Sequence, residues 1–192
     1  MALHDNFPSP PGPALRQLSQ EVLYRGKVFD LIVDHIQYPS GNHGVREVAR
    51  HPGGAVTVPL FPDRSILLVR QFRYPLQGYT LELPAGKLNA GEDPAEAAVR
   101  ELEEETGWIA GHLEKLTAIY TTPGFCTEIL HIFLATELRQ SPRGHHREEG
   151  ELGMSVHLLP LEEALGMAER GELNDSKTLV GLFLAERRLR QH

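Results

Sequence analysis

Hydrophobic and polar positions alternate over much of the first half of the chain. Between residues 28 and 37, Phe29, Leu31, Val33 and Ile36 are separated by other side chains, which is typical of a half-buried strand. Short β-branched and apolar segments bounded by turn residues predict further strands at 21–25, 44–50, 55–60, 65–72, 80–83, 116–121, 129–136 and 156–159. Strands therefore dominate the predicted structure.

Helical signals are concentrated in three segments. The strongest covers residues 93–106, where Asp93 is a typical N-cap, Pro94 suits the first helical position and Gly107 ends the helix. Apolar residues at helical spacing predict two more helices at 161–170 and about 176–190. Strands and helices do not alternate one to one, which favours an α/β fold with a mixed sheet flanked by helices.

The distribution of proline and apolar residues suggests three parts. Residues 1–15 are rich in proline and small polar residues and are expected to form a flexible arm. Residues 16–50 carry only strand signals, so we expect a small N-terminal β subdomain there. The remaining residues, 51–192, are expected to form the main domain, and a chain of 192 residues is long enough to bury a core.

Charge and composition exclude several classes of partner. The net charge is -7, so no basic field favours nucleic acid or anionic lipid. No apolar run approaches the roughly 18 residues of a membrane span, and the N-terminus lacks a signal-peptide core. The single cysteine, Cys126, excludes an intrachain disulfide framework. We therefore expect a cytoplasmic protein that binds neither nucleic acid nor membrane.

The predicted helix at 93–106 carries a cluster of acidic side chains. Glu101, Glu104 and Glu105 have the i, i+3, i+4 spacing that makes carboxylates neighbours on a helix. We expect them opposite the apolar face that packs on the sheet, which comprises Ala95, Ala98, Val99, Leu102 and Thr106. Adjacent like charges destabilise a helix, so either a bound Mg²⁺ or Mn²⁺ or plain solvation is expected there.

A longer motif decides between these alternatives. From Gly86 the chain reads GKLNAGEDPAEAAVRELEEETGW. This resembles the Nudix box: glycine, five residues, glutamate, seven residues, then Arg-Glu-aliphatic-any-Glu-Glu-any-Gly-aliphatic. Only Trp108 departs, because it is aromatic where the box has an aliphatic residue. The chain is thus identified as similar to the Nudix hydrolases.

The resemblance implies a fold and a set of site residues. The family fold is an α/β/α sandwich around a mixed sheet. Glu101, Glu104 and Glu105 match the family's metal ligands, with the carbonyl of Ala85 as a further backbone ligand and Mg²⁺ or Mn²⁺ as the cofactor. The remaining matches support the site: Glu92 and Arg100 hold the loop and helix together, and Gly86 allows the turn before the loop.

Features outside the box resemble the ADP-ribose pyrophosphatase branch. The segments Val69–Tyr74 and Leu81–Gly86 resemble that branch's VRQ-aromatic-Arg strand and Glu-hydrophobic-Pro-Ala-Gly turn, and Pro123-Gly124 follows the box at a typical distance. The implied reaction is hydrolysis of ADP-ribose to AMP and ribose 5-phosphate. The candidate residues for contact with the base and sugar are Phe29, Arg46 and Arg73. Glu82, in the Glu-hydrophobic-Pro-Ala-Gly turn, is a further candidate substrate contact.

A catalytic carboxylate is expected in the charged segment 141–151. Glu149 and Glu151 straddle Gly150 and resemble the acidic loop of the related enzymes. In an extended segment, residues two apart point the same way, so both are candidates, with Glu151 slightly favoured as the general base. Glu104 within the box is a third candidate.

Several alternatives remain open from the sequence. The loop 148–152 and the segment Asp175–Thr178 also resemble hydrolases of GDP-mannose and UDP-sugars. A non-catalytic nucleotide-binding Nudix module is a remote alternative, since such modules usually lose box glutamates. The related branch forms dimers, so we also expect a homodimer built by isologous contact.

Overall fold

Strands form most of the chain up to residue 140, and two helices lie near its C-terminal end. This computed structural model describes residues 15–145 and 153–191. The elements are β1 (Arg16–Arg25), β2 (Asp30–Gln37), β3 (His43–Arg50), β4 (Gly54–Pro59), β5 (Ser65–Arg73), a short 3-10 helix (Tyr74–Leu76), β6 (Gly78–Glu82), β7 (Ala85–Lys87), α1 (Pro94–Thr106), β8 (Trp108–Ile109), β9 (His112–Tyr120), β10 (Ile129–Thr136), β11 (Arg139–Gln140), β12 (Ser155–Pro160), α2 (Leu161–Glu169) and α3 (Ser176–Leu189).

The chain divides into two compact units, which are described separately. One unit combines Met1–Pro52 with Tyr120–Ile129, and the other combines Gly53–Ile119 with Leu130–His192. The first contains the antiparallel sheet β1–β2–β3. In its central strand β2, Ile32 and Ile36 are buried, whereas Phe29 just before the strand is exposed. Of the predicted alternating residues, Ile36 is buried as expected, whereas Ile32, and neither Leu31 nor Val33, is the other buried residue of the strand.

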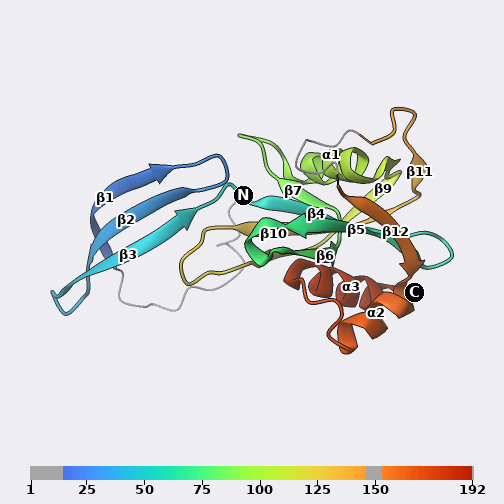
Figure 1. Cartoon of the computed structure of the whole chain (residues 1–192). Helices are drawn as coiled ribbons and strands as arrows, with labels where there is room; N and C mark the ends of the chain where they lie inside the picture. The colour runs from blue at the N-terminus through green and yellow to red at the C-terminus, as the bar shows by residue number, and fades with distance from the viewer. Residues whose placement is uncertain (1–14, 146–152, 192) are drawn as a thin grey trace. The chain divides into compact units, whose positions relative to one another are not determined.

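The second unit contains mixed β-structure with helices on both sides. Its four-stranded sheet has the order β7–β4–β10–β9, in which β4 and β10 are parallel and β4 and β7 antiparallel. A three-stranded antiparallel sheet has the order β12–β5–β6. Figure 1 shows α1 on one side of these strands and α2 and α3 on the other. The predicted mixed α/β architecture is thus confirmed.

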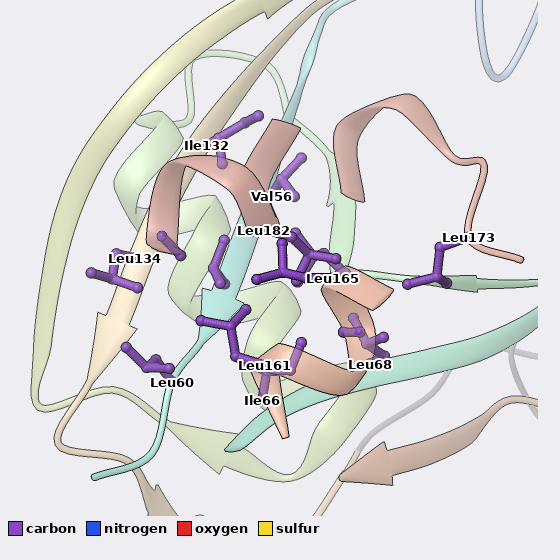
Figure 2. Close-up of a cluster of buried hydrophobic side chains, with 14 residues drawn as sticks. Val56, Leu60, Ile66, Leu68, Ile132, Leu134, Leu161, Leu165, Leu173 and Leu182 are labelled. Carbon is purple, nitrogen blue, oxygen red and sulfur yellow. The ribbon is translucent and has the colours of Figure 1, made fainter. Parts of the chain in front are cut away.

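Strand β4 packs against helices on both of its faces. Successive side chains of a strand point to opposite faces. Val56 and Val58 therefore join the large core with α2 and α3, whereas Ala55 packs with residues of α1. Strand β10 repeats this division, with Ile132 and Leu134 in the large core and Phe133 on the side of α1. Figure 2 shows the large core, where residues of β4, β5, β10, α2 and α3 converge.

Both faces of β4 and β10 are covered, so these strands are almost continuously apolar. In the part of the chain that the structure describes, no helix has the length and apolar character needed to cross a membrane.

Candidate active site

Helix α1 begins and ends at the residues that the sequence indicates. The Asp93 side chain accepts a hydrogen bond from the amide of Ala95 at 2.8 Å, and Pro94 is the first helical residue. Gly107 has a φ of 76°, a left-handed conformation that glycine adopts readily, and its amide donates to the carbonyl of Glu103 at 2.8 Å. The acidic cluster therefore lies on a helix with well-defined ends.

The buried face of α1 differs from the predicted one. Glu101 and Glu105 are only 8% and 2% exposed, so they lie on the packed side of the helix and not opposite it. Glu104 is the most accessible of the three, with 38% of its side chain exposed. The helix instead buries a face that includes two carboxylates: Ala97, Ala98, Glu101, Leu102, Glu105 and Thr106.

Room for the Glu101 carboxylate comes from a glycine on the neighbouring strand. A Cβ atom on Gly86 would lie 1.9 Å from Cδ of Glu101, a distance at which no real atom fits. Gly86 lies in β7, paired with Ala55 of β4, and its φ is not positive. In the structure this glycine leaves space for a carboxylate, and its role in allowing the turn stays a prediction.

The first residue of β7 and the residue before it are fixed to the same helix. The amide of Ala85 donates to Oε2 of Glu105 at 3.1 Å. The carbonyl of Pro84 accepts from the amide of Thr57 at 2.9 Å, and the Thr57 hydroxyl donates to the carbonyl of Ala98 on α1 at 3.0 Å. Ala85 and the glutamates, which are distant along the chain, are thus brought into one region.

Arg100 connects the acidic residues of the box. Its Nε and Nη2 atoms donate to the two carboxylate oxygens of Glu92 at 2.8 and 3.0 Å, a bidentate pair. Its Nη1 atom donates to Glu101 at 2.5 Å and to Glu104 at 3.0 Å, and Nη2 also reaches the carbonyl of Lys87 at 3.2 Å. One guanidinium therefore contacts three carboxylates, leaving the group net negative, and joins the loop before α1 to the helix.

These contacts shift the pKa values of both partners. The hydrogen bonds that Arg100 donates to Glu92 raise the pKa of the Arg100 guanidinium above its usual range, against the opposing effect of burial. The same hydrogen bonds lower the pKa of Glu92. Glu92 and Arg100 thus act as an ion pair at neutral pH, as expected for residues that hold the loop to the helix.

Whether the acidic residues fit a metal ion can be judged from their chemistry. Three carboxylates and a nearby backbone carbonyl form a set of hard oxygen donors, which suits Mg²⁺ or Mn²⁺. Within the described residues, no three His, Cys, Asp or Glu side chains are grouped so that they could hold an ion, and Arg100 is bonded to Glu101 and Glu104 instead. The donor types fit the ion, and the metal site stays a prediction.

A second polar cluster lies at Glu82, the last residue of β6. Its side chain is 3% exposed and accepts bonds from Nε and Nη2 of Arg73 at 2.7 and 2.6 Å. It also accepts from the Lys177 ammonium group and the Thr80 hydroxyl. Lys177 in turn donates to Asp175, the N-cap of α3, at 2.9 Å.

The electrostatics of this cluster are dominated by the Glu82 charge. Burial alone would raise the pKa of Glu82, but the hydrogen bonds from Arg73 and the positive charge of Lys177 outweigh it and lower that pKa to about 2. The pKa of Arg73 is raised, first by its hydrogen bond to Glu82 and further by the negative charges of Asp175 and Glu105. Of the carboxylates on α1, Glu105 therefore contributes to the charge environment of Arg73.

The candidate substrate residues fall into different parts of the structure. Arg73 and Glu82 contact each other in the larger unit, and Glu82 is enclosed while Arg73 is 38% exposed. Phe29 and Arg46 belong to the N-terminal unit, where Arg46 donates to the hydroxyl of Tyr38 at 3.0 Å and stacks over its ring. The candidate bases Glu149 and Glu151 lie outside the described residues, so their role stays a prediction.

Sequence reasoning did not assign a role to Lys177, Asp175 or Thr178. Lys177 is bonded to a residue 95 positions earlier, and no local pattern encodes such a contact. The helix signal was nevertheless present: Asp175 is an N-cap that accepts from the amide of Thr178 at 3.1 Å. A lysine just inside an acidic cap, next to apolar helical residues, could have indicated a buried ion pair.

Comparison with known proteins places this geometry in a family. The NUDIX domain matches residues 51–180. An ADP-ribose pyrophosphatase from Bacillus subtilis (strain 168) is 42% identical over 167 residues, covering 87% of this chain and 90% of the relative. A methanol dehydrogenase activator from Bacillus methanolicus is 36% identical over 167 residues, with the same coverage of each chain.

The fold comparison agrees with the sequence comparison. A crystal structure of an ADP compounds hydrolase matches with a TM-score of 0.79 at 23% identity, covering 95% of this chain and 97% of that chain. At this identity the likeness shows the fold. The matched domain contains the complete box from Gly86 to Trp108, including all of its glutamates. The chain therefore belongs to the Nudix hydrolase family.

Proposed function

We propose that this Nudix hydrolase cleaves the pyrophosphate bond of ADP-ribose, giving AMP and ribose 5-phosphate. The observation that carries the proposal is the group of glutamates on α1, two of them buried, beside Gly86 and Ala85. Arg100 contacts Glu101 and Glu104, and the three carboxylates are the hard oxygen donors that a divalent ion prefers. Such a site suits a divalent metal, which the family typically uses, and a diphosphate substrate.

The choice of ADP-ribose rests on similarity. The Bacillus subtilis relative named ADP-ribose pyrophosphatase shares 42% of aligned residues over nearly its whole length. The sequence features that support the same choice are the Arg73 strand and the Glu82 turn. Other nucleoside diphosphate sugars, such as GDP-mannose or a UDP-sugar, are the competing substrates.

The chain's own residues would divide the chemical work. Glu101, Glu104 and Glu105 would hold Mg²⁺, with the Ala85 carbonyl as a further ligand. When bound, Mg²⁺ would neutralise the diphosphate and favour ionisation of the attacking water. Arg100 and Glu92 would keep the loop and helix in register. Arg73 presents N–H groups beyond the two that Glu82 accepts, and these would hold a phosphate or sugar oxygen.

A base is still needed, since carboxylates committed to a metal are poor proton acceptors. Glu151, Glu149 and Glu104 are the candidates, and we favour Glu151. Glu104 is half-exposed and bonded to Arg100. A general base near the water typically contributes about 100-fold or more to the rate, so single substitutions can identify it.

Product analysis tests the function. The protein with Mg²⁺ would be incubated separately with ADP-ribose, GDP-mannose, UDP-glucose and ADP-glucose, and the products separated by ion-exchange chromatography. We expect ADP-ribose to have the highest kcat/KM and to yield equal amounts of AMP and ribose 5-phosphate. A higher kcat/KM for another sugar would contradict the substrate assignment, and no turnover of any substrate would favour the non-catalytic alternative.

We also propose that the chain forms a homodimer. Several apolar side chains of the N-terminal unit are exposed, among them Leu18, Leu23, Val28 and Val45. Covering such a surface by an identical one would remove apolar area from water. Light scattering should give about twice the 21.4 kDa chain mass, and a value near one chain mass would rule out the dimer.

A further inference from the structure

The first turn of α3 is bonded to the end of β6 through two adjacent residues. Lys177 donates to the Glu82 carboxylate, and the Thr178 hydroxyl accepts from the amide of Leu83 at 2.8 Å. Asp175 organises both, because it accepts from Lys177 at 2.9 Å and from the Thr178 hydroxyl at 2.6 Å. Helix α3 thereby fixes the end of β6 and Leu83, which lead into Ala85 and Gly86.

Stability alone does not explain a charged pair in this place. The side chains of Lys177 and Glu82 are 10% and 3% exposed, and withdrawing both charges from water has a large desolvation cost. Apolar residues of similar volume would often stabilise a fold equally well or better. A buried ion pair does, however, hold its members in one geometry, which favours a role in orientation.

The group that Glu82 orients in turn is Arg73. Two N–H groups of its guanidinium are used in the bidentate contact with Glu82. Toward the described residues, the guanidinium makes no other hydrogen bond, and 38% of the side chain is exposed. The rigid fork of an arginine means that fixing one edge also fixes the direction of the remaining donors. Glu82 therefore fixes the direction of the Arg73 N–H groups that make no hydrogen bond to the described residues. Lys177 contacts the same Glu82 carboxylate.

We propose that Lys177 is a positioning residue, which acts through Glu82 to aim the free donors of Arg73 at the anionic substrate. The inference rests on the proposed function, since it assumes a diphosphate substrate near α1. It adds a residue from the C-terminal helix to the site. Without Lys177, Glu82 would keep Arg73 and Thr80 but lose the partner that fixes its carboxylate on the α3 side.

Substituting Lys177→Met tests this, because methionine keeps most of the apolar stem and removes the charge. We expect KM for ADP-ribose to rise about tenfold, with kcat within about threefold of the wild-type value, which is the pattern of lost binding. Binding of α,β-methylene ADP-ribose in the presence of Mg²⁺, measured by calorimetry, should weaken by a similar factor. Lys177→Gln retains a donor for Glu82, so we expect a smaller loss and a folded protein even where the methionine variant unfolds.

A double-mutant cycle shows whether Lys177 acts through Arg73. Arg73→Lys keeps a cation beside Glu82 but loses the planar fork. If the action passes through Arg73, the double variant Arg73→Lys with Lys177→Met binds the analogue no more weakly than Arg73→Lys alone. Arg170→Met is the matched control, because it breaks an exposed pair with Glu172 and should leave binding unchanged.

Two results would overturn the proposal: folded Lys177 variants with wild-type KM and analogue affinity, or strictly additive losses in the cycle. Failure of the proposed function is recognised separately by Mn²⁺ titration followed by electron paramagnetic resonance. Lys177→Met should retain wild-type Mn²⁺ affinity, whereas Glu105→Gln should lose it. If Glu105→Gln binds Mn²⁺ and turns over ADP-ribose normally, the metal-dependent function fails whatever Lys177 does.

Discussion

Gly86 of β7 lies so close to Glu101 of α1 that a single methyl group at residue 86 would overlap the carboxylate carbon, 1.9 Å away. This contact explains why a glycine precedes the helix in the box, since any other side chain would occupy the place of a carboxylate. It also places a buried glutamate beside β7, whose first residue is Ala85. The relationship makes residue 86 a sensitive probe of the site.

Gly86→Ala should therefore impair the site without breaking the domain. Overpacking in a tight region costs about 1–3 kcal/mol, and here the displaced group is the Glu101 carboxylate. We expect that loss in urea unfolding, together with at least about tenfold weaker activation by Mg²⁺. Gly78→Ala is the control, because a Cβ there would meet only the carbonyl of Leu76 at an ordinary 3.6 Å. Equal effects of the two substitutions would contradict the proposed role of Gly86.

Glu105→Gln should reduce turnover by orders of magnitude while the protein remains folded. The amide keeps the size of the side chain, and its oxygen can still accept from Ala85, but one negative charge is lost from the metal site. The measurement is kcat with saturating Mg²⁺, alongside a thermal unfolding curve. Glu96→Gln, an exposed residue of the same helix, should change neither. Activity of Glu105→Gln within about threefold of wild type would remove the metal assignment.

Acid should unfold the protein partly through Glu82. Its pKa is about 2 in the folded state against 4.5 ordinarily, because the Arg73 hydrogen bonds and the Lys177 charge outweigh burial. Because the pKa of Glu82 is lower in the folded than in the unfolded state, its ionised carboxylate adds to the free energy of unfolding. This contribution is fully present above pH 4.5 and is lost as the pH falls toward 2. The loss should amount to roughly 3 kcal/mol at most.

Denaturant unfolding between pH 6 and pH 2 measures that contribution. Glu82→Gln, which does not titrate, should show a flatter dependence on pH across this window. Glu172→Gln removes an exposed carboxylate paired with Arg170 and should keep the wild-type slope. A wild-type slope in Glu82→Gln would show that other carboxylates account for acid unfolding.

The segment 141–151 should contain the general base. Glu149→Gln and Glu151→Gln remove the candidate carboxylates one at a time, and we expect at least one variant to lose about a hundredfold or more in kcat with near-normal KM. Single-turnover kinetics with Mg²⁺ separates this loss from slow product release. If both variants stay active, Glu104→Gln becomes the decisive measurement, because Glu104 is the remaining candidate.

The sequence by itself determined the three helices, most of the longer strands and the identity of the box. Local rules were enough for α1, since the Asp93 cap, Pro94 and Gly107 act within one or two turns of the chain. The fixed spacing of box residues identified the family for the same reason: motif positions are read along the chain. Short strands such as β7, β8 and β11 were missed, because two or three residues carry too little periodicity to be recognised.

Only the tertiary structure decided which charged groups are buried and what they touch. The helical period puts Glu101 and Glu105 on one side, but the burial of Glu101 depends on a neighbouring strand that has a glycine at residue 86. The bond from Lys177 to Glu82 joins residues 95 positions apart, and it forms only because packing brings α3 against the end of β6. Desolvation and long-range pairing belong to the folded arrangement, so a linear pattern could indicate the acidic cluster but not its environment.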